Sequence, residues 1–415
     1  MSASPFARFV AASGLTNLAD GIATVAWAWL ASLLTRDPLM IALVAVALRV
    51  PWFLFAIPAG VITDRVDRRL LILRMDMLRG LTFGFAALAI WFTQPLAPAT
   101  MTLTQPGLYI AILVAATLVG IAEVFRDNAA QTMLPALVPQ AHLEKANGRL
   151  WSVELIGNAL LGPALGAFLI AAALPLPFAA GALAYAIAVI LVLAVKGRFQ
   201  PAQIEARDWR RELREGFQFL WHAQLLRSLA WITGVWNLLF QMVMIALVLH
   251  VQENLGLDAR AYGLILAAGA LGGIAGGWWG DAIITKVGPK RAAQWMLLAS
   301  FPSFVGIAYA PGPVALAIVL AAFEFTGLVW NTVSVSYRQR KIPDALLGRV
   351  NSLYRLLAWG MMPVGLLLSG LIVRGAEGSF ARDTALTAPF LVAALGALIL
   401  AIAGWRALER GFEAT

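Results

Sequence analysis

Ionisable side chains interrupt several long apolar runs of the sequence, and these residues are the first candidates for chemistry. Asp20, Arg49 and Glu154 each lie well inside such a run. A charge in apolar surroundings is costly unless it faces a partner or water, so charges retained there usually serve binding or proton transfer. A carboxylate such as that of Asp20 can accept a proton, whereas an arginine stays charged and needs an acidic partner. By depth along their runs, Asp20 and Glu154 are the expected partners of Arg49.

We expect these three residues to couple proton binding to a change of conformation, because a protonated carboxylate no longer attracts an arginine. The alternative for Asp20 is structural: a hydrogen bond that braces its helix against a neighbour. Five more polar residues in apolar runs complete the candidates for proton coupling or substrate binding: Asn17, Glu123, Asn237, Gln241 and Glu324. Asn237 and Gln241 stand one turn apart and either line a cavity or pack between helices. Glu324 either serves coupling or pairs with Arg355.

Other kinds of reactive site find no support in the residues. The sequence contains no cysteine and only three histidines, which excludes disulfides and thiolate chemistry. The histidines at positions 142, 222 and 250 are too far apart for metal-ligand spacing. A phosphate-binding glycine loop, a His-Glu-x-x-His pair and a nucleophile elbow are all missing from the sequence. We therefore expect neither an enzyme nor a metal or organic cofactor.

The elements that must position these residues are membrane helices. The 415 residues are 61% hydrophobic and 13% charged, whereas soluble domains carry about a quarter charged residues. A spanning helix needs about 20 apolar residues, and two sets of six such runs are present: 6–34, 39–60, 70–93, 107–131, 146–171 and 177–196, then 227–251, 260–281, 292–310, 313–337, 349–373 and 385–407. The sequence predicts an all-α membrane protein of about twelve spans.

Basic residues predict the orientation of these helices, because cytoplasmic loops hold an excess of Lys and Arg. With the N-terminus inside, 23 of the 31 Lys and Arg fall on the cytoplasmic side. We expect both termini in the cytoplasm, a bacterial inner membrane as the location and its anionic inner leaflet as a partner. The net charge of +9 is spread over short loops, so no nucleic-acid partner is expected.

The chain divides into two related halves. We expect an N-terminal bundle over 1–196, a central cytoplasmic segment over 197–226 with an amphipathic helix, and a C-terminal bundle over 227–415. Short patterns recur between the halves: Pro139, Leu143 and Asn147 return as Pro343, Leu347 and Asn351, and Gly60 and Asp64 return as Gly277 and Asp281. Two parallel six-helix repeats are an arrangement found in secondary transporters. We expect a monomer.

A charged motif follows the second predicted helix, where residues 60–69 read GVITDRVDRR. It resembles the loop motif of the major facilitator superfamily, Gly-x-x-x-Asp-Arg-x-Gly-Arg-Arg, with Asp67 in place of the last glycine. This resemblance implies the two-bundle fold and a charge latch that holds one conformation. The implied latch residues are Gly60, Asp64, Arg65, Arg68 and Arg69, together with Arg126 and Asp127.

Three further stretches are similar to an efflux subgroup that includes enterobactin exporters and macrolide pumps: residues 17–21, 126–135 and 262–264. Gly162, Pro163 and Gly166 resemble the antiporter signature Gly-x-x-x-Gly-Pro-x-x-Gly-Gly, although Asn158 and Ala167 replace two of its glycines. A small-residue seam between two helices explains the same residues without any directional meaning.

The resemblance implies proton-coupled efflux of lipophilic drug-like or siderophore-like small molecules by alternating access, with the proton gradient as the driving force. Two alternatives remain open: an importer of a nutrient or siderophore with the same fold, and a receptor or scaffold that transports nothing.

Overall fold

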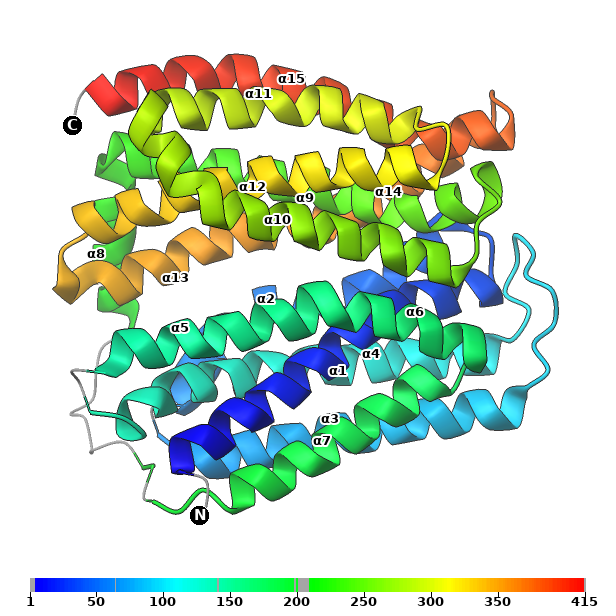
Figure 1. Ribbon diagram of the computed structural model, residues 1–415, viewed down its shortest axis with the longest axis horizontal. Helices are drawn as coiled ribbons and strands as arrows, with labels where there is room; N and C mark the ends of the chain where they lie inside the picture. The colour runs from blue at the N-terminus through cyan, green and yellow to red at the C-terminus, as the bar shows by residue number, and fades with distance from the viewer. Residues whose placement is uncertain (1–3, 64, 140–141, 198, 201–208, 414–415) are drawn as a thin grey trace. The chain divides into compact units, whose positions relative to one another are not determined.

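The computed structural model describes residues 4–63, 65–139, 142–197, 199–200 and 209–413. All regular structure in these ranges is helical (Figure 1). The helices are α1 (Pro5–Leu34), α2 (Pro38–Thr63), α3 (Arg68–Thr93), α4 (Pro106–Met133), η1 (Leu134–Ala136), α5 (Leu143–Glu154), η3 (Leu155–Leu161), α6 (Gly162–Ala172), α7 (Leu176–Leu193), α8 (Trp209–His222), α9 (Gln224–Leu249), η4 (His250–Asn254), α10 (Ala259–Val287), α11 (Pro289–Ala308), α12 (Pro313–Lys341), α13 (Asp344–Gly360), α14 (Met362–Glu377) and α15 (Arg382–Glu413).

Eleven helical segments in the described residues are long and apolar enough to cross a membrane. The 20-residue helix α11 is the expected twelfth, and Lys290 and Arg291 in its first turn reduce its apolar content. The predicted all-α membrane fold is confirmed.

Two spans are broken in the middle, and each break precedes a proline. The fifth span consists of α5, the π-helical η3 and α6, with Pro163 at the second position of α6. The eleventh consists of α13 and α14, with Pro363 at the second position of α14. Proline lacks an N–H and its ring clashes with the carbonyl four residues earlier, so the α-helical ladder cannot continue unchanged.

Contacts between helices divide the chain into two compact units. Unit 1 comprises residues 1–204 with 258–267, and unit 2 comprises 205–257 with 268–415. In unit 1, α1 packs on α6 and α7, α3 packs on α4 and α7, and α2 packs on α4 (Figure 1).

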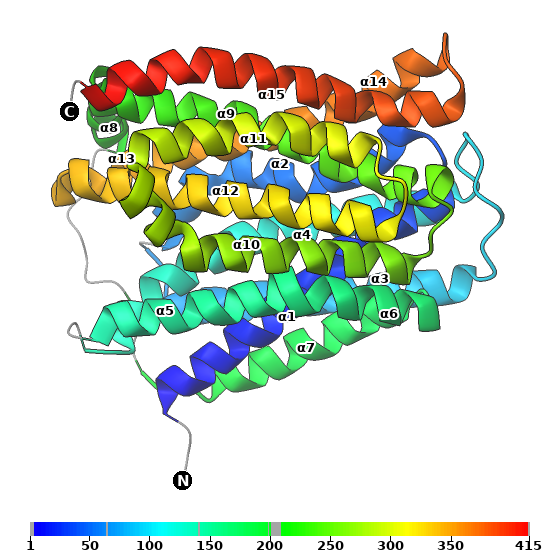
Figure 2. The same cartoon turned by 45° about the horizontal axis from the view of Figure 1, so that its top comes forward.

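Unit 2 repeats this packing pattern with its own helices. In it, α9 packs on α14 and α15, and α11 packs on α12 and α15 (Figure 2). The glycines of α10 lie against α12, as α2 lies against α4 in unit 1. The amphipathic helix predicted for the central segment is α8, which packs on α9 and α13; residues 201–208 of that segment lie outside the described residues.

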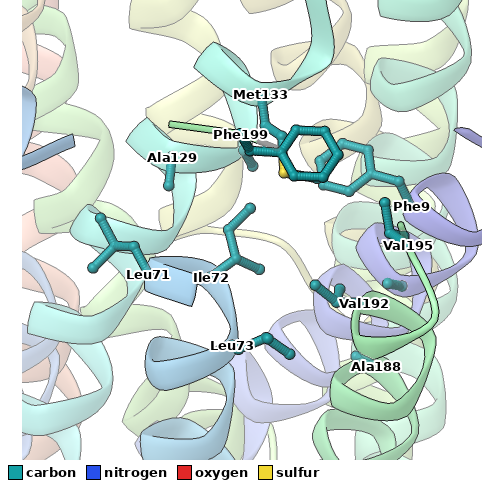
Figure 3. Close-up of a cluster of buried hydrophobic side chains, with 12 residues drawn as sticks. Phe9, Leu71, Ile72, Leu73, Ala129, Met133, Ala188, Val192, Val195 and Phe199 are labelled. Carbon is teal, nitrogen blue, oxygen red and sulfur yellow. The ribbon is translucent and has the colours of Figure 1, made fainter. Parts of the chain in front are cut away.

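A layer of aliphatic and phenylalanine side chains fills the inside of unit 1 near the ends of four helices. Phe9 of α1, Ile72 of α3 and Met133 of α4 are completely buried there, and they converge with Val192 at the end of α7 (Figure 3). This layer excludes water from one end of the bundle and thereby defines the environment of the charged residues described next.

Candidate functional site

Asp20 holds together three helices of unit 1. Its carboxylate Oδ1 forms an ion pair with the guanidinium of Arg79 on α3 and accepts a 2.5 Å hydrogen bond from the hydroxyl of Tyr185 on α7. The Arg79 side chain is only 1% exposed, whereas that of Asp20 is 19% exposed. The Arg79 guanidinium also lies 4.5 Å from the centre of the Tyr185 ring. One carboxylate with a partly accessible edge therefore joins α1 to α3 and α7.

A second ion pair lies one helical turn away along α3. The Asp76 carboxylate faces Nε of Arg126 on α4 at 3.6 Å, with both side chains buried. Arg126 also donates to the Ser13 hydroxyl of α1 at 3.2 Å and to Asp127 at 3.3 Å. The predicted latch residue Arg126 thus faces the interior of unit 1. Neither carboxylate oxygen of Asp76 has a hydrogen-bond partner.

Apolar layers enclose this charged layer on two sides. The layer of aliphatic and phenylalanine side chains begins about one turn away on three helices, at Ile72, Ala129 and Ala188. In the opposite direction along the bundle, the aromatic rings of Trp27, Phe83 and Phe178 pack together with centroids 4.8–6.1 Å apart. Since apolar material closes both ends, the exposed edge of Asp20 is the accessible part of its ion pair.

The other predicted residues of unit 1 lie around this layer. Glu123 on α4 is half-buried and within electrostatic reach of Asp20, Arg49 and Arg79. Arg49 on α2 and Glu154 at the end of α5 are exposed. Asn17 donates to the Ser13 carbonyl of its own helix at 2.9 Å.

The expected pairing of Asp20 with Arg49 is wrong, because Asp20 pairs with Arg79 instead. Depth along a helix does not say in which direction around the helix a side chain points.

One of the predicted residues of unit 2 donates a hydrogen bond to a neighbouring helix, whereas the described structure gives the other two no such bond. Asn237 is buried and donates to the Ala358 carbonyl of α13 at 2.9 Å, so it packs between helices. Gln241 is half-buried one turn further along α9. Glu324 on α12 is also half-buried, and its side chain packs toward Gly269 and Gly273 of α10.

The loop motif supplies caps for helix ends. Arg68 donates to the Thr132 carbonyl at 2.9 Å, and Arg69 donates to the carbonyls of Val192 and Leu193 at 3.0 and 2.5 Å. These carbonyls end α4 and α7, where a positive charge is favourable. Asp67 departs from the family motif and caps α3 by accepting from the Leu70 N–H at 2.9 Å.

The remaining motif residues contribute less to the packing of unit 1. Arg65 is exposed, and a side chain at Gly60 would meet no atom within 4 Å. Asp64 lies outside the described residues. The latch therefore stays a prediction.

Gly162 and Gly166 form a close seam between α1 and α6, while the carbonyl of Pro163 faces Gly263 of α10. A Cβ at Gly162 would lie 2.5 Å from the Gly21 Cα, and one at Gly166 would lie 2.5 Å from the Ile22 carbonyl oxygen. Only glycine permits this backbone approach. The packing of α1 on the fifth span is thus sufficient to explain the two glycines.

Sequence reasoning missed Asp76, Arg79 and Tyr185 as members of the site. Asp76 and Arg79 stand three residues apart inside the predicted run 70–93, which places them on one helix face. This spacing was the available signal. Tyr185 gave none, since a single tyrosine in an apolar run is common.

The described residues contain no group of three or more His, Asp and Glu that could hold a metal ion. What the arrangement can do chemically is exchange a proton at Asp20. Protonation would remove the negative charge that Arg79 and Tyr185 share, and so weaken the joint between α1, α3 and α7.

Comparison with known proteins relates the chain to membrane transporters. The sequence profile of the Major Facilitator Superfamily matches residues 9–366. The multidrug efflux pump Tap of Mycolicibacterium fortuitum is 28% identical over 408 residues, which cover 95% of this chain and 94% of that protein. Tap of Mycobacterium tuberculosis is 27% identical over 412 residues, which cover 95% and 92%.

Solved structures show the same fold. A bacterial homologue of the human lysosomal transporter Spinster gives a TM-score of 0.74 at 14% identity, covering 99% of this chain and 97% of that one. The nucleoside transporter NupG gives 0.73 at 13% identity, covering 98% and 99%. A bacterial homologue of the iron transporter ferroportin, in an inward-facing state, gives 0.71 at 17% identity, covering 96% and 98%.

Proposed function

The chain belongs to the Major Facilitator Superfamily, and on this premise we propose that it is a proton-coupled exporter of lipophilic drug-like or siderophore-like small molecules. It works by alternating access in the inner membrane of a bacterium, as a monomer with both termini in the cytoplasm. The proton gradient is its driving force, and no cofactor takes part. The names of the two Tap relatives support export of drug-like cargo, and the siderophore class rests on the motif resemblance.

The single observation that carries the coupling proposal is the position of Asp20. It is the one member of its ion pair with appreciable exposure, at 19% against 1% for Arg79, so a proton reaches it without crossing either apolar layer. In its charged form it holds three helices through Arg79 and Tyr185. Binding of a proton therefore removes the negative charge of Asp20 and weakens the contacts that hold the three helices together.

When Asp20 is protonated, the Arg79 guanidinium interacts instead with other acidic side chains nearby. Asp76 lies one turn away on the same helix, and Glu123 lies within electrostatic reach on α4. The buried or partly buried charges of this cluster are the three carboxylates Asp20, Asp76 and Glu123 and the two arginines Arg79 and Arg126. With one carboxylate in excess, the cluster becomes neutral when it holds one proton. A bound proton is then compatible with a low-dielectric surrounding.

The test is transport by the purified full chain in proteoliposomes with an imposed pH gradient. Two dyes of different charge, ethidium and Nile red, serve as cargo, so that the result does not depend on one cargo charge. We expect vesicles with an acidic lumen to accumulate dye, and collapse of the gradient to release it. Flux that ignores the gradient would exclude proton coupling.

Asp20→Asn should abolish gradient-driven accumulation and retain exchange of cargo at equilibrium, since the joint is then permanently uncharged. The matched control is Asp258→Asn, because Asp258 is exposed and caps α10 through the Ala261 N–H at 2.9 Å, a role that asparagine also fills. Normal active transport in Asp20→Asn would remove this residue from the coupling mechanism. Accumulation only from an acidic medium would indicate import, and no flux of any cargo would indicate a receptor or scaffold.

A further inference from the structure

Unit 1 has a groove beside the first turns of α1 that the coupling mechanism does not use. Two hollows of about 250 and 310 Å³ lie between the start of α1 and α5, and both are lined by Phe6 and Arg149, so they adjoin. The first extends to Pro139 and His142, and the second extends along α1 to Gly14. Together they form what we call the α1–α5 groove. Each hollow is close to the lower limit of small-ligand sites, roughly 300 Å³.

The walls of the groove are mostly apolar, and it opens along α1. Ala7 and Ala11 line the second hollow and are exposed. The N-terminal half of α1 lies between α5 and α7, which both pack on it (Figure 2), so the two alanines face outward between these helices. At the other end, a Cβ at Gly14 would lie 2.6 Å from Cγ1 of Val153, so α5 closes the groove there. From Ser4 to Gly14 the groove follows α1 for about 15 Å.

The polar side chains of the groove suit an anion. Arg149 of α5 is exposed, and among the described residues no hydrogen bond or ion pair joins its guanidinium to the protein. None of the described residues that line the groove is an Asp or Glu, and His142 adds an imidazole N–H. An unpaired arginine beside an apolar groove fits a ligand with anionic oxygens at one end and an apolar body.

The place of the groove in the bilayer indicates which ligand this is. The start of α1 meets the end of α7, where Arg8 donates to the Ala194 carbonyl at 2.6 Å, and the basic residues predict that this end faces the cytoplasm. The cytoplasmic leaflet carries anionic phospholipids, whose head groups bind in basic pockets between spanning helices. A length of about 15 Å is half of the hydrocarbon thickness of about 30 Å. The groove therefore has the length of the acyl chains of one leaflet.

We propose that the α1–α5 groove binds an anionic phospholipid of the inner leaflet, with its phosphate on Arg149 and one acyl chain along Ala7 and Ala11. The planar guanidinium can donate two parallel hydrogen bonds to phosphate oxygens, and the chain covers apolar surface that α5 and α7 leave exposed. The bound lipid contacts α1, the helix that carries Asp20. This inference requires neither export nor proton coupling, because lipid binding is an equilibrium property of the folded chain.

The test is native mass spectrometry of the full chain released from detergent, which counts the lipid molecules that stay bound. Dioleoyl phosphatidylglycerol and dioleoyl phosphatidylcholine have the same acyl chains, and only the first carries a net negative charge. We expect the wild type to bind one phosphatidylglycerol about fivefold tighter than phosphatidylcholine. Arg149→Gln should lose this preference, and Arg149→Lys should keep it. Ala11→Phe fills the groove without a change of charge and should lose the tightly bound lipid.

The matched control is Arg74→Gln, which removes an exposed arginine of α3 that does not line the groove and should leave the preference unchanged. Gel filtration and tryptophan-detected unfolding verify that each variant is folded. Equal binding of the two lipids by the wild type, or equal effects of Arg149→Gln and Arg74→Gln, would overturn the site. Displacement of the lipid by an equal concentration of glycerol phosphate would assign the groove to a soluble anion instead. A dimer that Ala11→Phe abolishes would assign it to a second copy of the chain, and would likewise overturn the proposal.

Discussion

Arg79 illustrates why the buried charges of unit 1 must be considered as pairs. Its side chain is 1% exposed and its guanidinium depends on the Asp20 carboxylate. Removing one member of a buried pair leaves the other as an uncompensated charge, which is strongly destabilising, whereas removing both is much milder. The pair is therefore accessible to a double-mutant cycle.

We predict that Arg79→Gln lowers the free energy of unfolding by about 3 kcal/mol. The double variant Asp20→Asn with Arg79→Gln should lose clearly less than the sum of the two single variants. Thermal unfolding followed by the fluorescence of the 15 tryptophans measures each change. Additive losses would show that the two side chains do not depend on each other, and would contradict the ion pair.

At the scale of single residues, the sequence identifies the charged positions better than their partners. Asp20 and Glu123 are visible as charges in apolar runs, and both lie in the charged layer of unit 1. Depth along the helices predicted Arg49 as the partner of Asp20, whereas in the structure Asp20 forms an ion pair with Arg79. The choice depends on which helices are neighbours and on how each is rotated, and a single sequence contains neither quantity.

Helix ends in unit 1 depend on arginines that arrive from elsewhere in the chain. Arg69 reaches the last carbonyls of α7 from the first turn of α3, and Arg8 of α1 donates to the Ala194 carbonyl at 2.6 Å. The bonds to the Leu193 and Ala194 carbonyls satisfy groups that the end of α7 leaves unpaired, whereas the Val192 carbonyl also accepts from the Val195 N–H at 3.0 Å. The arginines of the loop motif thus have a structural role that is independent of any latch.

Arg69→Gln should therefore lower the stability of the protein by about 2 kcal/mol, the usual value for hydrogen bonds to a charged group. Arg65→Gln, in the same sequence motif but exposed, is the control and should leave the unfolding temperature unchanged. If both variants unfold like the wild type while transport fails, the arginines act only in conformational change.

The seam between α1 and α6 gives a prediction about packing. We expect Gly162→Ala to destabilise the protein by about 1–3 kcal/mol, because its Cβ would lie 2.5 Å from the Gly21 Cα and the helices would have to separate. Gly107→Ala in α4, where no atom lies within 4 Å, should be neutral or slightly stabilising, since alanine favours a helix. Unfolding temperatures of the two variants test this contrast, and equal values would contradict the seam.

At the scale of elements, apolar run length predicts the helices well. The expected run 70–93 corresponds to α3 (Arg68–Thr93), and 39–60 corresponds to α2 (Pro38–Thr63). The breaks in the fifth and eleventh spans were not predicted, although Pro163 and Pro363 mark them. Proline is frequent in membrane helices, so its presence alone does not tell a break from a tolerated kink such as that at Pro51 of α2.

The whole molecule repeats one packing pattern with different chemistry in each unit. Unit 1 contains the paired charges of Asp20, Asp76, Arg79 and Arg126, while unit 2 contains a stack of aromatic rings around Trp236. The fold was predictable because lipid as a solvent imposes long apolar helices regardless of detail. The different chemistry of the two units was predictable only in part, because it depends on which buried charges form ion pairs.

The orientation of the whole chain in the membrane is the remaining prediction. With 23 of 31 Lys and Arg in the loops assigned to the cytoplasm, we expect both termini inside, since these residues resist translocation across the membrane. Green fluorescent protein fused after α15 should fluoresce, and alkaline phosphatase fused there should be inactive. Phosphatase inserted between α3 and α4, in residues 94–105, should be active, because that loop contains no Lys or Arg. Reversed activity at both positions would contradict this orientation and place both termini outside.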